Sequence, residues 1–523
     1  MPVGLSTTPR QGTGPSRRPD VRHVPRWLPP VLLAAAWLAV LVAHLRAPVP
    51  SDQLNYMTAA ARFPRPVEAT TEMHQVTRFG LIVPVRLAIA VFGYSQAAYA
   101  VVPVLATLTL LVGAYALGTL LFARSVGIAG SLAVVAATPV FADSTDLLPD
   151  VLATGLFTCA LALAVAIGRR EDAPGKAVLL AVGALLGWSY LAREFVVFMW
   201  PVALVPLYRR AGLAGLLWTA LPVAAIGAAE LLLCWRLYGD PLARLLAITG
   251  HGGRPSPPEI ASTYRDKPRM MYVLRLPKTL QDYPEGGLLV ALIGLTLLGG
   301  LLRPRRMAVP VAACALLWIP LTLLGGVLDP SAPKLRLQLI RYWFPIFPAF
   351  VLGGLGFLWL AAAYGAGRLP ERLRGRVRVL PAVLVLAVAV VISGVAARSW
   401  WAPPATRAGG GTQMESLRTW LHGHGGSGTR IWADSRTGKV LRVYRQGFWG
   451  GTAWSARIRV ARPGGEGPRP GDLLVYYDTE RGSQCSLCRK AALDMVRDPA
   501  WSGPAWHQVY GTPDRVVRVY RRG

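Results

Sequence analysis

Apolar residues in this chain are collected in long continuous runs that are separated by short polar stretches. Two examples are VLLAAAWLAVLVAHL at 31–45 and GGLLVALIGLTLLGGLL at 286–302. Runs of this kind match the hydrocarbon thickness of a bilayer at the rise of an α-helix, and inside lipid a helix satisfies its own backbone donors and acceptors. An outer-membrane barrel would instead show alternating segments of about ten residues. The pattern therefore predicts an all-α, polytopic membrane protein.

Twelve apolar runs are candidate spans. They are 27–45, 79–93, 96–122, 126–142, 150–168, 177–192, 194–208, 213–237, 285–302, 307–327, 343–364 and 379–397. The segment 78–93 is short and carries Arg86 near its middle, two residues after Pro84. An unpaired arginine at the bilayer centre costs several kcal/mol. We therefore expect this segment to lie at the interface as an amphipathic helix, which leaves about eleven spans.

The short basic loops predict the orientation. With the basic tail 1–26 in the cytoplasm, where we expect it to be disordered, eleven spans place every tight basic loop inside, as the positive-inside rule requires. These loops are FARS (122–125), RREDAPGK (169–176), YRR (208–210), RPRR (303–306) and GRLPERLRGRVR (367–378). The segments 143–150, 192–194 and 238–284 then lie outside. Since the outer segments 46–86 and 238–284 are also rich in arginine, the tight loops and the parity of the spans decide together. The chain is expected to be a multi-pass plasma-membrane protein with a cytoplasmic N-terminus.

About 125 residues follow the last span and form a different kind of region. Its apolar pattern predicts helices at 414–424 and 485–497, and strands at 430–434, 471–478 and 515–522. We expect a transmembrane domain over 27–397 and a small extracytoplasmic α/β domain over 398–523.

Composition and charge support the membrane class and add little about ligands. Apolar residues make up 53% of the chain and charged residues 16%. The net charge is +29, because 50 arginines and 6 lysines outnumber 27 acidic residues. Much of that charge lies in the loops between spans, which suits anionic or phosphorylated lipids rather than nucleic acid. Three cysteines lie within apolar runs, whereas Cys485 and Cys488 form a CSLC motif that is either a local disulfide or two free thiols.

Polar residues gather at the outer ends of the predicted spans, which is where a membrane enzyme would keep its chemistry. The candidates are Asp52, Tyr56, His74, Arg78, Asp146, Asp150, Arg193, Glu194, Arg254, Tyr264, Lys267, Arg341 and Tyr342. Each has an ordinary structural explanation as a helix cap, an interfacial anchor, an ion pair or part of a solvated loop. Together they combine carboxylates with arginines on one side of the membrane. That combination suits a reaction whose leaving group is a lipid phosphate.

Several of these residues lie in motifs that resemble the lipid-carrier-dependent glycosyltransferases of the GT-C fold. DQLNY (52–56) after the first span resembles the acidic start of that family's first outer loop, and HQVTRFGLIVP (74–84) resembles its outer helix. Pro149-Asp150, Arg193-Glu194, GDPL (239–242) and Arg341-Tyr342 follow in the same order along residues 27–365. The family includes protein mannosyltransferases and the aminoarabinose transferase of lipid A, and this chain resembles the broader bacterial branch.

The resemblance implies an inverting transfer of one sugar, hexosyl or pentosyl, from a polyprenyl phosphate to an acceptor hydroxyl on the outer face. Asp52 matches the position of the family's catalytic base, and Arg341 and Arg193 would stabilise the departing phosphate. The acceptor would be a glycan, a glycolipid or a protein of the cell envelope. Gln53 follows Asp52 where an acidic residue is common in relatives, so we expect no obligatory metal or other cofactor.

Two other functions remain open at the level of sequence. A transporter or flippase of lipid-linked glycans would carry charged residues midway along its spans and show internal repeats, whereas this chain has mostly clean apolar interiors. A non-enzymatic cell-envelope scaffold would bind a partner through its outer domain and would not need a polar site at the outer membrane face.

Overall fold

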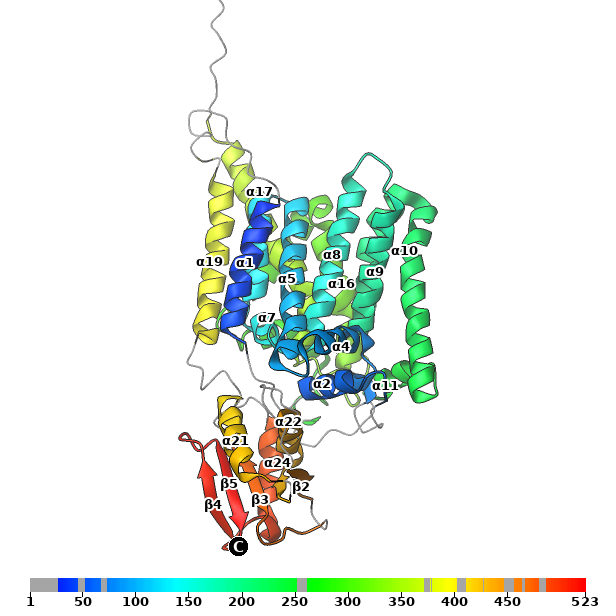
Figure 1. Cartoon of the computed structure of the whole chain (residues 1–523). Coiled ribbons are helices and arrows are strands. Elements are labelled where there is room, and N and C mark those ends of the chain that lie inside the picture. Colours follow the sequence, from blue (N-terminus) through cyan, green and yellow to red (C-terminus); the bar gives the residue numbers. More distant parts are fainter. Residues whose placement is uncertain are drawn as a thin grey trace, which may run out of the picture.

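A computed structural model describes residues 27–45, 52–66, 73–251, 261–370, 377, 379–401, 411–426, 428–445, 456–462, 466–478 and 486–523. Figure 1 shows a bundle of long helices with a smaller mixed α/β domain beneath one end. The predicted tail 1–26 lies outside the described residues.

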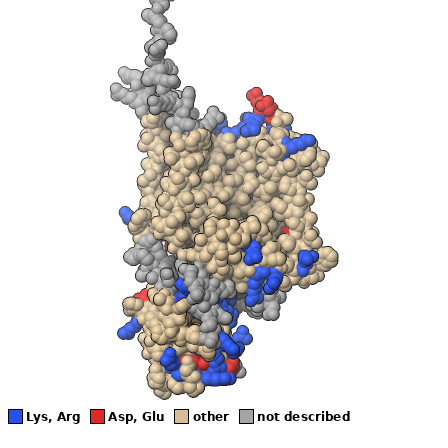
Figure 2. Space-filling view, in the orientation of Figure 1, with Lys and Arg blue, Asp and Glu red and all other residues tan. Residues whose placement is uncertain are grey.

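The bundle consists of apolar helices that run roughly side by side (Figure 1). They are α1 (Leu28–Ala43), α5 (Gln96–Leu121), α6 (Arg124–Ala136), α8 (Pro149–Arg169), α9 (Lys176–Ala192), α10 (Trp200–Tyr238), α15 (Gly286–Leu302), α16 (Pro304–Thr322), α17 (Phe347–Gly367) and α19 (Leu380–Trp400). Among the described residues, six helical segments are long and apolar enough to cross a membrane, and five shorter apolar helices accompany them. Figure 2 shows the same division on the surface, with an uncharged belt between two ends that carry the charged side chains. The multi-pass membrane class is confirmed.

Two backbone breaks modify the predicted spans. The predicted span 126–142 is wrong as a single helix, because at Ala137 (φ −52°, ψ 128°) the chain leaves the helical region between α6 and α7 (Thr138–Asp143). The helix α10 is interrupted at Gly212, where φ is 61° and ψ is −160°. Only glycine adopts such a conformation readily, and this break separates the predicted runs 194–208 and 213–237.

Short helices collect at the end of the bundle that faces the α/β domain. They are α2 (Asp52–Arg62), α3 (Met73–Val76), α4 (Phe79–Phe92), α11 (Ala243–His251), α13 (Arg269–Val273) and α14 (Arg275–Leu280), with the irregular turns η1 (Glu194–Met199), η2 (Leu323–Val327) and η3 (Ile340–Ile346). Figure 1 shows α2 and α4 lying across the bundle helices, as expected of the segment 78–93. His74 and Arg78 do not lie on one continuous helix, because α3 ends at Val76 and Arg78 precedes α4.

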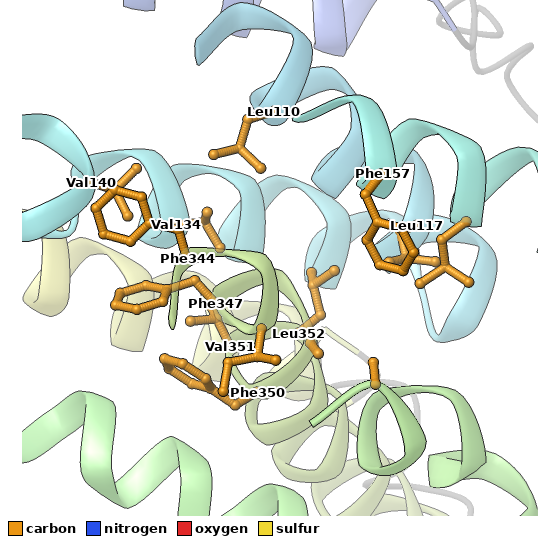
Figure 3. Close-up of a cluster of buried hydrophobic side chains, with 14 of the residues drawn as sticks. Leu110, Leu117, Val134, Val140, Phe157, Phe344, Phe347, Phe350, Val351 and Leu352 are labelled. Atoms are coloured by element: carbon orange, nitrogen blue, oxygen red, sulfur yellow. The ribbon is translucent and has the colours of Figure 1, made fainter. Parts of the chain in front are cut away.

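The bundle core centres on α17, which packs against α6, α15, α16 and α19. Figure 3 shows Phe347, Phe350 and Leu352 of α17 among Leu117 of α5 and Phe157 of α8. Aromatic side chains bury large apolar areas, and small residues elsewhere let backbones approach closely, as is usual between membrane helices.

The C-terminal domain is a five-stranded sheet with helices. Its elements are α21 (Gly411–His424), β1 (Arg430–Ala433), α22 (Ser435–Arg445), β2 (Arg457–Val460), β3 (Leu473–Tyr477), α24 (Ser486–Arg497), η4 (Pro499–Trp501), β4 (Trp506–Gly511) and β5 (Val517–Arg522). The strand order is β2-β1-β3-β5-β4, with β1 parallel to its neighbours β2 and β3, and β5 antiparallel to its neighbours β3 and β4.

The three predicted strands and two predicted helices of this domain are present, whereas β2, β4 and α22 were missed. β2 alternates exposed and partly buried residues but is only four residues long, Arg457–Val460, which is too short to stand out in the sequence. β4 has one buried residue, at its first position, and does not show the alternation that identifies a half-buried strand. Cys485 and the side chain of Cys488 lie outside the described residues. The domain contacts the bundle through α22, which lies against α2.

Candidate active site

The centre of the site is Asp52, the first residue of α2. One of its carboxylate oxygens, Oδ2, lies 2.9 Å from Nη2 of Arg341, and the other, Oδ1, accepts a hydrogen bond of 2.7 Å from Nε2 of Gln75. Burial raises the pKa of this carboxyl, but the positive charges of Arg341, His74 and Arg78 outweigh it and hold the pKa below its usual value. Asp52 is therefore ionised at neutral pH.

A chain of hydrogen bonds connects Asp52 with the C-terminal domain. Nδ2 of Asn55 donates to Oε1 of Gln75, and Nζ of Lys439 on α22 donates to Oδ1 of Asn55 at 3.3 Å. Gln75 is buried, so its amide has little freedom to rotate away from the carboxylate. The α/β domain is thereby linked to the carboxylate of Asp52 through two side-chain amides.

Arg78 connects α2 with the turn after α9. Its guanidinium donates to the hydroxyl of Tyr56 at 3.3 Å and lies 3.5 Å from Oε1 of Glu194. Burial raises the pKa of Tyr56 to about 12, so the phenol keeps its proton at neutral pH. Arg78 itself is buried, but Tyr56 and the carboxylate of Glu194 raise its pKa and keep it charged.

Gly80 explains how Arg78 comes so close to Glu194. A Cβ atom at Gly80 would collide with the backbone of Leu191 and Ala192 at the end of α9. Because glycine has no side chain, the start of α4 can lie directly against the residues that precede Glu194. The indole of Trp188 donates to the carbonyl of Gly80 at 3.0 Å and adds to this contact.

A second ion pair, between Arg193 and Asp150, is buried. Nε of Arg193 lies 2.9 Å from Oδ1 of Asp150, with both side chains almost completely inaccessible to solvent. The Arg193 guanidinium also lies over the rings of Phe195 and Tyr342, at 4.8 Å and 4.9 Å from their centroids. Tyr342 follows Arg341 directly, so this buried pair supports the backbone that presents Arg341 to Asp52.

Most of the predicted site residues come together at this end of the bundle. Asp52, Tyr56, His74, Arg78, Asp150, Arg193, Glu194, Arg341 and Tyr342 are connected by the contacts and charge interactions above. Asp146 borders them, since it accepts a hydrogen bond from Gln53 at 3.2 Å.

Three predicted residues come from the long loop after α11. The backbones of Tyr264 and Lys267 contact Tyr272, whose hydroxyl donates to the Tyr264 carbonyl at 2.8 Å and accepts from the Lys267 amide at 3.2 Å. Their role in the site stays a prediction. Arg254 lies outside the described residues.

Four contributing residues were missed at the level of sequence. Arg244 of α11 is buried, donates to Glu230 at 2.9 Å and lies 3.9 Å from Glu194. The other three are Asn55, Gln75 and Lys439. Asn55 and Gln75 lie close in sequence to Asp52 and His74, and Lys439 lies in α22. Amides and single charged residues are common in any sequence, so only the tertiary contacts distinguish these three.

The contact between Gln75 and Asp52 supports a first prediction. In Gln75→Leu we expect kcat/KM to fall about tenfold, because a hydrogen bond to a charged group is lost. Because the lost donor stabilised the ionised carboxylate, the acid limb of the pH profile should also move to higher pH. The exposed Gln281→Leu is the matched control. An unchanged pH profile in Gln75→Leu would contradict a role in positioning Asp52.

Within the described part of the chain, no three His, Cys, Asp or Glu side chains are grouped so that they could hold a metal ion. The carboxylates of the site are instead paired with guanidinium groups, Asp52 with Arg341 and Glu194 with Arg78. The expected independence from metal stays a prediction.

The fold and site together define a multi-pass helical membrane protein with a carboxylate–arginine centre at one end of its bundle. No protein-family model and no curated protein matches the chain. Solved structures do match over nearly its whole length. ArnT from Cupriavidus metallidurans bound to undecaprenyl phosphate is 14% identical, with a TM-score of 0.54 over 94% of this chain and 97% of that one. Its apo state gives 13% and 0.55 over the same shares.

A third match is the arabinofuranosyltransferase AftD from Mycobacteria, in a mutant form. It is 14% identical, with a TM-score of 0.50 over 95% of this chain and 42% of that chain. At these identities the likeness concerns the fold. The chain has the GT-C fold that its outer-loop motifs resemble, and the structural similarity extends over most of the chain.

Proposed function

We propose that this protein transfers a sugar from a polyprenyl-phosphate donor to an acceptor hydroxyl on the outer face of the membrane. The observation that carries the proposal is the ionised carboxylate of Asp52, held between Arg341 and Gln75 in a GT-C fold. The undecaprenyl phosphate bound to ArnT supports a lipid-phosphate donor. A non-enzymatic scaffold would not require a cluster of polar residues at this end of the bundle.

The reaction follows from the properties of these groups. The acceptor oxygen attacks the anomeric carbon of the sugar from the side opposite the phosphate, which inverts the configuration. Its proton passes to the carboxylate of Asp52 as the new C–O bond forms, and the bond between the anomeric carbon and the phosphate oxygen breaks. The electron pair of that bond leaves with the polyprenyl phosphate.

The arginines at the site are suited to stabilise the negative charge that develops on the phosphate in this step. The phosphodiester of the donor carries one negative charge and the departing phosphate monoester carries up to two, so positive charge fixed near the phosphate stabilises the transition state more than the ground state. Arg341 is half-buried and is already oriented by Asp52. Arg78 and Arg244 are each paired with Glu194 and would shape the site around it.

The orientation completes the proposal. We infer eleven spans, since α10 counts as two runs and α4 lies across the bundle. With a cytoplasmic N-terminus, the transmembrane domain 27–397 then presents Asp52 outside, beside the extracytoplasmic domain 398–523. Since nucleotide sugars are largely confined to the cytosol, an outer site requires a donor that is carried by a lipid.

Incubation of the purified, reconstituted protein with a panel of labelled polyprenyl-phosphate sugars tests this function. We expect release of free polyprenyl phosphate and transfer of label with one hexosyl or pentosyl donor. Transbilayer movement of the donor in liposomes without any transfer would contradict the proposal and favour a flippase.

Removal of metal gives a further prediction. We expect transfer to continue at an unchanged rate after dialysis against EDTA, because guanidinium groups already neutralise the carboxylates that a cation would need. The measurement compares initial rates before and after chelation and after addition of Mg²⁺ or Mn²⁺. Loss of transfer that Mn²⁺ alone restores would show that a metal takes part.

A further inference from the structure

The sheet of the C-terminal domain has two unequal faces. On one face, Ile431, Leu473 and Val519 pack against Leu417 of α21 and Val440 of α22 in a closed core. The other face carries the alternate residues of the same strands and is covered by α24 and η4. These two elements leave a gap, so part of this second face opens to solvent.

The gap is a pocket of about 340 Å³, within the size range of small-ligand sites. Its walls are Tyr476 of β3, Trp501 of η4, Trp506 of β4, and Arg518 and Tyr520 of β5, with Leu474, Val496, Ser502 and Gly503. Four aromatic rings from four separate elements therefore converge on one opening. The transmembrane site uses none of these residues.

This pocket is lined by both aromatic and polar groups. The rings of Trp501 and Trp506 lie 6.4 Å apart at an interplanar angle of 29°, which makes a nearly flat apolar wall. The polar part of the lining comes from Arg518, whose guanidinium lies 4.7 Å from the centre of the Tyr476 ring. Its Nε atom has no hydrogen-bond partner among the residues that the structure describes. The Arg518 side chain is 28% exposed, so the accessible part of its guanidinium can donate to a ligand oxygen in the pocket.

Charge restricts the class of ligand. Asp478 lies 3.7 Å from Nη2 of Arg518, so the polar side of the pocket is close to neutral overall. An anion such as a phosphate would meet this carboxylate, and a purely apolar ligand would remove water from the exposed part of the Arg518 guanidinium without offering it an acceptor. A neutral molecule with a flat apolar face and hydroxyl groups along its rim satisfies both walls. Sugar rings have this chemistry, since their C–H faces pack on aromatic rings and their hydroxyls accept and donate hydrogen bonds.

We propose that this pocket binds a neutral oligosaccharide, and that it holds the acceptor glycan for the transferase. The acceptor role rests on the proposed function, whereas oligosaccharide binding does not. The same domain contacts α2 through Lys439 and Asn55, so a glycan held on its outer sheet face is anchored to the body that also borders Asp52. This arrangement assigns a glycan, rather than a protein or a lipid, as the acceptor.

Binding of defined oligosaccharides to the full-length protein in detergent tests the site. The probes are short mannan, galactan, arabinan and glucan oligosaccharides, and the readouts are calorimetry and quenching of tryptophan fluorescence. We expect one of them to bind, and the variants Tyr476→Ala and Arg518→Ala to weaken that binding by about tenfold or more. Both residues are half-buried, so truncation leaves the core of the sheet in place. Tyr510→Ala, which removes an aromatic ring stacked on Trp420 away from the pocket, is the matched control.

The outcomes separate this inference from the proposed function. Asp52→Asn should bind the oligosaccharide as the wild type does, and Tyr476→Ala should still transfer sugar to a small soluble acceptor alcohol while losing transfer to the oligosaccharide. If none of the four probes binds, or if both pocket variants are folded and bind like the wild type, the pocket is not a glycan site. Binding that persists in a protein without any transferase activity would overturn the proposed function and leave the pocket assignment in place.

Discussion

The variant Asp52→Asn is expected to lose sugar transfer by about 10²- to 10⁴-fold, the range typical of a positioned general base. Asparagine has the same shape, and its amide oxygen can still accept the hydrogen bond from Arg341 that the carboxylate accepts at 2.9 Å. It cannot take the proton of the acceptor hydroxyl. The fold and the affinity for polyprenyl phosphate should therefore remain, while the chemical step fails.

Single-turnover transfer from a radiolabelled donor measures this effect, and binding of polyprenyl phosphate checks the integrity of the site. Asp282→Asn is a suitable control, because Asp282 is an exposed carboxylate in the turn between α14 and α15 at the same end of the bundle. Wild-type turnover in Asp52→Asn would exclude Asp52 as the base and leave it as a helix-starting residue.

The variant Arg193→Met is expected to lower the free energy of unfolding by about 3–5 kcal/mol, because it leaves the buried carboxylate of Asp150 without its partner. The double variant Asp150→Asn, Arg193→Met should regain most of this loss, since neither remaining side chain carries a charge. Thermal unfolding of the solubilised protein, followed by tryptophan fluorescence, measures the difference among the variants.

A strongly non-additive result would identify the pair as a support for the site rather than as a contact to the donor phosphate. Additive effects would contradict this interpretation, and a specific loss of donor affinity in Arg193→Met would favour the role that the family resemblance implies for Arg193. The structure favours support, because the Arg193 guanidinium is enclosed by Asp150, Phe195 and Tyr342.

Much of the fold could be predicted because its signals are local. A run such as 286–302 identifies a membrane helix by its own length and apolarity, and it appears as α15 with bounds Gly286–Leu302. Arg86 likewise predicts an interfacial helix from one charged residue in a short segment, and α4 lies across the bundle. The break at Ala137 was missed because an apolar run can bend without any change in composition.

The sequence predicted which residues form the candidate site better than it predicted which of them pair with one another. Sidedness alone groups Asp52 with Arg341, but it does not show which arginine meets which carboxylate. Arg193 was expected to stabilise the departing phosphate, but the sequence did not indicate that it would pair with Asp150. Arg244 was not singled out at all, because one arginine in an arginine-rich loop has no distinguishing neighbour in sequence.

By itself, the sequence determined the membrane class, the approximate spans, the α/β character of the last 125 residues and the grouping of acidic and basic residues on one side. These properties follow from the length and periodicity of each segment in its solvent. Only the tertiary structure decided that Asp52 meets Arg341 across 289 positions, and that Lys439 of a separate domain reaches Asn55 across 384. Such contacts depend on how whole elements pack. Gly80 allows one close approach because it has no side chain, and no local sequence pattern shows which element will lie against it.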